Sequence, residues 1–340
     1  MSDLPKLGID IGSASIKLVE LAPMGKDRWK LLSAASMTSY QGGVTGNLAN
    51  LAPFSQSVAK ILKESGARSR RVVAALPEEQ ISSHVVEMPL MSDDEVRQAL
   101  QWQVEQYIPI PAEKAVWSYQ IIKKDAQGGG MEVLLVAAAK NLVNAYTQIL
   151  EQAGLEVVAL ETELMATSRA VISGAYPLSM IVDIGAKGTD LGIIKNGLLV
   201  FSRTVPTAGE AFNRAITSTL GLDASQAEQY KRTYGFVANQ LEGKLAEAMR
   251  PVLVVIANEI KKTAEFYTSK HPGEEVKIVT LSGGVAALPD IVGAMSGLVG
   301  VEVAIANPFG KLVMDAGQQK ALAGAGPFYV VAVGLAMRGL

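Results

Sequence analysis

The segment Gly8-Ile9-Asp10-Ile11-Gly12-Ser13-Ala14-Ser15-Ile16-Lys17-Leu18-Val19 has the pattern of an apolar strand, a tight turn of small residues and a returning strand. The pattern returns as Met180-Ile181-Val182-Asp183-Ile184-Gly185, a polar turn and Asp190-Leu191-Gly192-Ile193-Ile194. The two Asp-Ile-Gly motifs lie 173 positions apart, from Asp10 to Asp183. This repetition indicates an internal duplication.

Each copy suits a phosphate chain. Small residues in a tight turn present backbone N–H groups without obstruction, as Gly12, Ser13, Ala14 and Ser15 would. Asp10 and Asp183 at the strand ends would face the phosphates, which requires a cation such as Mg²⁺, held through bound waters. Lys17 can neutralise phosphate charge. A single aspartate before a turn is also commonplace, and strand lysines are usually solvated, so the duplication carries this interpretation.

Composition narrows the class of protein. A chain of 340 residues favours two lobes of roughly 150 residues with a cleft between them, and 49% hydrophobic with 19% charged residues favours a packed fold. The net charge of −2 without a basic run argues against nucleic-acid binding. The sequence has no cysteine and two histidines, which excludes disulfides and thiolate metal sites. Any catalysis must therefore use carboxylates, hydroxyls, lysines and bound metal.

The N-terminal residues and the length of the apolar stretches predict a cytoplasmic protein. Residues 1–6 show no signal-peptide pattern. The most apolar stretches, 251–257 and 328–337, are far shorter than the ~20 residues that cross a bilayer.

Periodicity and turn signals predict an α/β fold in three parts. We expect a first lobe over residues 1–160, a second lobe over 161–326, and a C-terminal helix over 327–340 that returns to the first lobe. A unit inserted in the first lobe is predicted over about 82–153, with strands at 81–88, 115–123 and 131–139 and helices at 93–107 and 142–153. Elsewhere we expect three strands within 6–39, a helix at 55–65, a strand at 71–76, helices at 209–220, 224–234 and 239–269, and a strand at 276–281.

Three motifs resemble the superfamily of actin, sugar kinases and chaperone ATPases: 10–17 and 183–190 look like its two phosphate motifs, and Leu281-Ser282-Gly283-Gly284-Val285-Ala286-Ala287-Leu288-Pro289 like its adenosine motif. The resemblance implies an actin-like ATPase fold: two lobes with duplicated βββαβα cores around a nucleotide cleft, and an inserted α+β subdomain in the first lobe. It also implies ATP and Mg²⁺ as ligands.

Within that superfamily the chain resembles the PilM family of type IV pilus assembly proteins, which is related to FtsA. The resemblance rests on residues 8–20, 87–91, 105–109 and 151–160. It implies an adaptor that holds the cytoplasmic N-terminal segment of the membrane protein PilN in a groove between the first lobe and the inserted unit. It further implies contacts with other pilus platform and motor components, and a position at the inner face of the inner membrane with membrane contact only through partners.

The resemblance also implies site residues. Thr207-Ala208-Gly209-Glu210 looks like a helix start that approaches the phosphates, and Glu228 with Lys231 like a pair that reaches ribose and adenine, although the two could be only a surface ion pair. Glu161 is the candidate carboxylate to orient attacking water, or a helix cap. The second phosphate loop, 186–189, lacks the consecutive glycines of many relatives. The predicted nucleotide-binding residues are Gly12, Ser13, Ala14, Ser15, Lys17, Gly185, Ala186, Lys187, Thr189, Gly209, Glu210, Asn213, Glu228, Lys231, Gly283, Gly284, Val285 and Leu288.

Three functions remain open from the sequence. The first is an adaptor that binds ATP and hydrolyses it slowly or not at all. The second is a small-molecule kinase on the same fold, which ADP release with an acceptor would reveal. The third is an FtsA-like filament-forming protein, which sedimentation with ATP would reveal.

Overall fold

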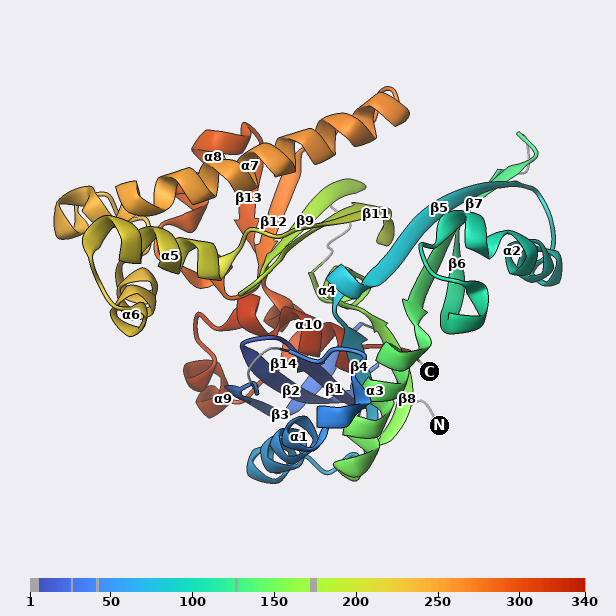
Figure 1. Cartoon of the computed structure of the whole chain (residues 1–340), viewed down its shortest axis with the longest axis horizontal. Coiled ribbons are helices and arrows are strands. Elements are labelled where there is room, and N and C mark those ends of the chain that lie inside the picture. Colours follow the sequence, from blue (N-terminus) through green and yellow to red (C-terminus); the bar gives the residue numbers. More distant parts are fainter. Residues whose placement is uncertain (1–5, 26, 41–42, 126–127, 172–175, 340) are drawn as a thin grey trace.

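Two separate sheets, one built around each copy of the repeated hairpin, form the cores of two lobes (Figure 1). The computed structural model describes residues 6–25, 27–40, 43–125, 128–171 and 176–339. The first five residues of the predicted first lobe and the last residue of the predicted C-terminal helix therefore lie outside the described residues. Among those described, no helix is both long enough and apolar enough to span a bilayer.

The first lobe holds a six-stranded sheet in the order β14-β3-β2-β1-β4-β8. Helices α1 and α3 cover one face, where apolar side chains of β1 and β2 such as Leu7 and Leu18 join the helices in one core. Helices α4 and α10 cover the other face, where they pack against apolar side chains such as Val19 and Val73. The bounds are β1 (Lys6–Ile11), β2 (Ser15–Pro23), β3 (Trp29–Thr38), α1 (Ala52–Ser65), β4 (Arg71–Leu76), α3 (Lys140–Gln152), β8 (Glu156–Thr162), α4 (Glu163–Val171), β14 (Leu312–Val313) and α10 (Gly326–Ala336).

The second lobe holds a five-stranded sheet in the order β11-β10-β9-β12-β13. Helices α5 and α6 start and end where the periodicity predicts them. The third predicted helix starts at Lys244 rather than 239, because Leu241 and Glu242 take left-handed backbone angles, with φ of 48° and 58°. The bounds are β9 (Leu178–Ile184), β10 (Thr189–Lys195), β11 (Leu198–Val205), α5 (Gly209–Leu220), α6 (Ala224–Tyr234), α7 (Lys244–Lys270), β12 (Ile278–Ser282), α8 (Ile291–Val299) and β13 (Glu302–Ile305). Helix α9 (Ala316–Ala321) follows β14 and lies beside β3 of the first lobe, where the Gln318 side chain donates to the Leu31 carbonyl (Figure 1).

The inserted unit is a three-stranded antiparallel sheet, β5-β7-β6, with α2 on one face. The predicted capping box of α2 is present: the Ser92 side chain accepts the backbone N–H of Glu95, and the Glu95 carboxylate accepts that of Ser92. A short 3₁₀ turn, η2 (Glu78–Gln80), leads from β4 directly into β5. The bounds are β5 (Ile81–Pro89), α2 (Asp93–Tyr107), β6 (Ala115–Asp125) and β7 (Gly130–Ala139).

Helix α3 does not belong to the inserted unit, contrary to the predicted boundary at 153. Its buried residues, among them Leu142, Tyr146 and Ile149, pack with α1 in the first-lobe core. The inserted unit therefore ends near residue 139. Helical periodicity reveals that a helix has an apolar face, but not which of two sheets that face covers.

The C-terminal helix α10 returns to the first lobe and packs against β1, β2 and α4. Every described residue of α10 except Phe328 is buried. The packing depends on two glycines: a Cβ at Gly8 would overlap the Ala332 carbonyl of α10, and a Cβ at Gly334 would overlap the Ala166 carbonyl of α4. Main chains thus lie in direct contact at the crossing of the two helices.

Replacement of Gly334 by alanine should lower the free energy of unfolding by about 3 kcal/mol, because the new methyl group meets rigid backbone rather than a side chain that can move. Urea unfolding measures this. The matched control is Gly297→Ala in α8, where an added Cβ meets nothing within 4 Å; it should be neutral or stabilising by up to about 1 kcal/mol. Equal stability of both variants would contradict the close crossing.

Candidate nucleotide site

A cavity of about 730 Å³ lies between the lobes and is lined by both repeated hairpins. Every predicted nucleotide-binding and metal-binding residue lines it except Thr189, whose buried hydroxyl donates to the Thr207 carbonyl at 2.7 Å. Residues from three distant parts of the sequence, around 10–17, 183–231 and 283–288, therefore meet at one cavity.

The turns of the two hairpins are structurally equivalent. The Gly12 N–H donates to the Ser15 carbonyl at 3.1 Å, and the Gly185 N–H donates to the Gly188 carbonyl at 3.0 Å. The strand registers are equivalent too, because Asp10 pairs with Lys17 and Asp183 pairs with Asp190. The duplicated hairpins thus differ in charge at one matched position, a lysine in the first lobe and an aspartate in the second.

Lys17 is a charged group enclosed by the site. Its side chain is 14% exposed, its ammonium lies 2.9 Å from Asp10 Oδ2, and it sits 4.8 Å from the centre of the Phe328 ring. Burial alone would lower the pKa of Lys17, but the charge and hydrogen bond of Asp10, with the charges of Asp183 and Glu163, raise it. The ammonium therefore stays protonated and available to an anion.

More acidic than basic side chains line the cavity. Burial raises the pKa of Asp183, raises that of Glu78 to about 7, and raises those of Glu163 and Asp190 well above the usual range; neighbouring carboxylates add to each shift. Such a wall favours a cation. Among the described residues no group of three or more acidic or histidine side chains is placed to hold a metal directly. The charged lining residues are Asp10, Glu78, Glu79, Glu163, Asp183, Asp190, Glu210 and Glu228 against Lys17, Lys187, Lys231 and Arg232.

Glycines keep this cavity open. Gly283 has φ +82°, and a Cβ there would lie 2.7 Å from Asp183 Oδ1, while Ser282 donates its hydroxyl to Asp183 Oδ2 at 2.7 Å. A Cβ at Gly12 would lie 3.1 Å from the Ser15 carbonyl oxygen. Side chains at these positions would crowd the main-chain groups that face the cavity, so the turns fit a ligand that contacts backbone.

The start of α5 is tied to the second turn. The Gly209 and Glu210 N–H groups donate to the carbonyls of Gly185 and Ala186, at 3.0 and 2.8 Å. The helix N-terminus, with its partial positive charge, therefore borders the second turn, where an anion would be stabilised.

On α6, Glu228 accepts Lys231 Nζ at 2.6 Å and Asn213 Nδ2 at 2.7 Å. Burial opposes ionisation of Glu228, but hydrogen bonds from Lys231, Asn213 and Arg232 hold its pKa down at about 2. The buried Asn213 Oδ1 atom has no hydrogen-bond partner among the described residues. A buried acceptor in a cavity lining calls for a donor from a ligand or a water, which fits the predicted ribose and adenine side of the site.

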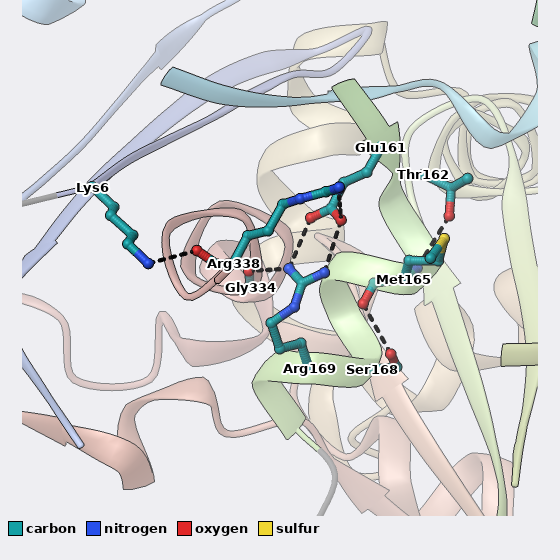
Figure 2. A network of polar contacts seen from close by, with 8 residues as sticks. All are labelled: Lys6, Glu161, Thr162, Met165, Ser168, Arg169, Gly334 and Arg338. Atoms are coloured by element: carbon teal, nitrogen blue, oxygen red, sulfur yellow. Dashed lines mark hydrogen bonds and ion pairs between the residues drawn. The ribbon is translucent and has the colours of Figure 1, made fainter. Parts of the chain in front are cut away.

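Glu161 is not among the residues that line the cavity. Its side chain is 3% exposed and binds Arg169 through both oxygens, at 2.8 and 2.7 Å, while Arg338 Nη1 lies 2.7 Å from Oε2. Arg169 Nη1 also donates to the Gly334 carbonyl, and Lys6 Nζ donates to the Arg338 carbonyl at 2.8 Å (Figure 2). Glu161 thus joins β8 to α4 and α10. The carboxylate that lines the cavity is Glu163, at the first position of α4.

Sequence reasoning missed several lining residues. The sequence spacing could have identified Asp190, since it follows Asp183 by the same seven positions that separate Lys17 from Asp10. Glu78, Glu79 and Tyr146 had none, because only the path of the chain around the inserted unit brings them to the cavity.

The family model described as type IV pilus assembly protein PilM matches residues 8–340. The solved PilM–PilN type IV pilus biogenesis complex is similar in structure, with a TM-score of 0.84, 28% identity and 98% of each chain covered. MreB5 of Spiroplasma citri bound to AMPPNP shares the fold, with a TM-score of 0.54, 16% identity, and 97% and 94% covered.

Among curated proteins, the cell division protein FtsA of Bacillus subtilis is 22% identical over 209 residues, which are 52% of this chain and 45% of that protein. The match therefore spans less than half the length of that relative.

Glu161→Gln should lower the free energy of unfolding by about 2 kcal/mol, because two arginines lose the charge that they share at a buried position. Thermal or urea unfolding measures this. The matched control is Glu156→Gln on the same strand, whose side chain is 70% exposed and which should change stability by less than about 0.5 kcal/mol. A neutral Glu161→Gln would contradict the structural role.

Proposed function

This chain belongs to the PilM family of type IV pilus assembly proteins, and we propose that it acts there as a cytoplasmic adaptor that binds ATP with Mg²⁺ and holds the cytoplasmic N-terminal segment of PilN. The observation that carries the nucleotide part is the pair of equivalent turns, closed at Gly12 and at Gly185, that line one cavity from opposite lobes.

The proposed placement of ATP follows from the donors at hand. The backbone N–H groups of residues 13–15 and 186–187 would bind the phosphates beside the N-terminus of α5, and Lys17 would offset their charge. The adenosine would lie between Glu228, Lys231 and the 283–288 segment. Mg²⁺ would neutralise phosphate charge, with Asp10 and Asp183 orienting its bound waters. The excess of carboxylates around the cavity favours that cation.

Hydrolysis is proposed to be slow or absent. Glu163, rather than Glu161, is the lining carboxylate at the place where a water could be oriented. Burial and the charges of Asp190, Asp10 and Asp183 raise the pKa of Glu163 well above its usual range. A carboxyl group that tends to keep its proton is a poor acceptor of another, so the site holds nucleotide better than it activates water.

The partner part of the proposal rests on similarity to the chain solved in the PilM–PilN complex over 98% of both chains. We place the PilN segment between the first lobe and the inserted unit. In this proposal the protein lies at the inner face of the inner membrane, contacts the membrane only through PilN and other partners, and meets further platform and motor components of the pilus machine.

Asp10→Asn and Asp183→Asn should each abolish most of the gain in ATP affinity that Mg²⁺ provides, because an amide no longer attracts the hydrated cation. The measurement is the Kd for ATP by calorimetry with Mg²⁺ and with a chelator. We expect a ratio of at least about tenfold in the wild-type chain and below about threefold in the variants. The exposed Asp94→Asn is the control. Wild-type ratios in both site variants would contradict the metal assignment.

A synthetic peptide of the PilN N-terminal segment should bind the full chain, and binding should persist with ATP and Mg²⁺ present. Calorimetry in each nucleotide condition tests this; a tenfold change of peptide affinity between conditions corresponds to about 1.4 kcal/mol of coupling. Absence of peptide binding under every condition would contradict the adaptor function.

A further inference from the structure

We propose that Glu78 is the positioning residue through which the nucleotide cavity and the inserted unit affect one another. The inference rests on the proposed function, because it assigns the means by which nucleotide and partner binding are coupled. It concerns a side chain that no sequence motif marks.

The segment that leads into the inserted unit is itself part of the cavity wall. Pro77, Glu78, Glu79 and Gln80 all line the cavity, and β5 begins at the next residue, Ile81. Strand β5 follows the wall segment directly, ends at Pro89 and extends into the inserted sheet (Figure 1). A change in the wall therefore reaches the inserted unit through continuous backbone.

Glu78 and the start of α4 hold each other in place. The Glu78 N–H donates to Glu163 Oε2 at 3.1 Å, and the Leu164 N–H donates to Glu78 Oε2 at 3.4 Å. Each glutamate thus accepts a backbone N–H from the other's segment. Glu163 also lines the cavity, so the position of this lining carboxylate depends on that of Glu78.

The second lobe joins the same group. The hydroxyls of Ser202 on β11 and Thr162 on β8 lie near enough to the Glu78 carboxylate to oppose the rise of its pKa. Strands β5 and β11 contact each other beside this point. Glu78 is therefore bonded to the start of α4 and lies beside the edge strand of the second lobe. A movement of one lobe relative to the other would change the surroundings of this carboxyl group.

The buried Glu78 carboxyl group is stabilised by its hydrogen-bond donors. Glu78 is 4% exposed, and among the described residues it forms no ion pair with a cation. Its partners are neutral donors. Burial, aided by Asp183, raises its pKa to about 7. A buried carboxyl that loses a neutral hydrogen-bond donor is destabilised, because water does not replace the lost partner. Rearrangement at Ser202 or Leu164 thus changes the energy of the whole junction, which is what coupling requires.

A helix cap alone would have a different signature. If Glu78 only capped α4, its replacement by glutamine, which keeps an acceptor for Leu164, would leave the ratio of partner affinities unchanged and alter at most stability. If Glu78 couples the sites, loss of its charge changes the ratio while each ligand still binds.

The test measures the affinity of the full chain for the PilN segment peptide with and without a non-hydrolysable ATP analogue and Mg²⁺. We expect the wild-type ratio to be at least about fivefold and the Glu78→Gln ratio to fall below about twofold. Each variant's affinity for the peptide alone should stay within about threefold of wild type. The control Glu87→Gln makes the same chemical change on the exposed face of β5 and should keep the wild-type ratio.

Ser202→Ala provides a second variant that leaves Glu78 in place, and it should reduce the ratio in the same direction because it removes the hydroxyl of the second lobe that acts on the Glu78 carboxyl. Equal ratios in wild type, Glu78→Gln and Ser202→Ala would overturn the role of Glu78, as would a wild-type ratio near one. Failure of the wild-type chain to bind either ligand alone would instead contradict the proposed function.

Discussion

The structure depends on how negative charge is compensated where the two lobes meet. The duplicated hairpin brings two strand ends with aspartates, Asp10 and Asp183, to one cavity, and other carboxylates join them. The Asp10–Lys17 ion pair is the compensation that the chain supplies at the centre. The matched position in the second lobe is Asp190 rather than a lysine, and burial raises the pKa of Asp190 well above its usual range. The divalent cation of the proposed ligand would supply positive charge on this side of the cavity.

Rigid packing behind the cavity keeps this arrangement in place. Helices α4 and α10 cross with main chains in contact at Gly334, and Glu161 joins both through Arg169 and Arg338 (Figure 2). Glu163, at the start of α4, faces the cavity from the end of that packed helix. Glu161 and Glu163, two positions apart, thus have different roles. Glu161 stabilises the crossing of α4 and α10, and Glu163 faces the cavity.

Much of the fold and site follows from local pattern. The duplicated Asp-Ile-Gly motif predicts two lobes and one cavity, since its turns and registers repeat in space as they do in sequence. What local pattern cannot predict is set by long-range packing. Helix α3 joins α1 rather than the neighbouring inserted sheet, and Glu161 pairs with an arginine 177 positions away. Glu78 reaches the cavity only because the chain enters and leaves the inserted unit at the cleft.

The central claim is that both hairpins bind one triphosphate. A crystal structure of the full chain with a non-hydrolysable ATP analogue and Mg²⁺ tests it most directly. The account predicts phosphate oxygens within hydrogen-bond distance of backbone N–H groups in both 13–15 and 186–187, with the metal ion between Asp10 and Asp183. Phosphates bound to one turn alone, or a nucleotide outside this cavity, would contradict it.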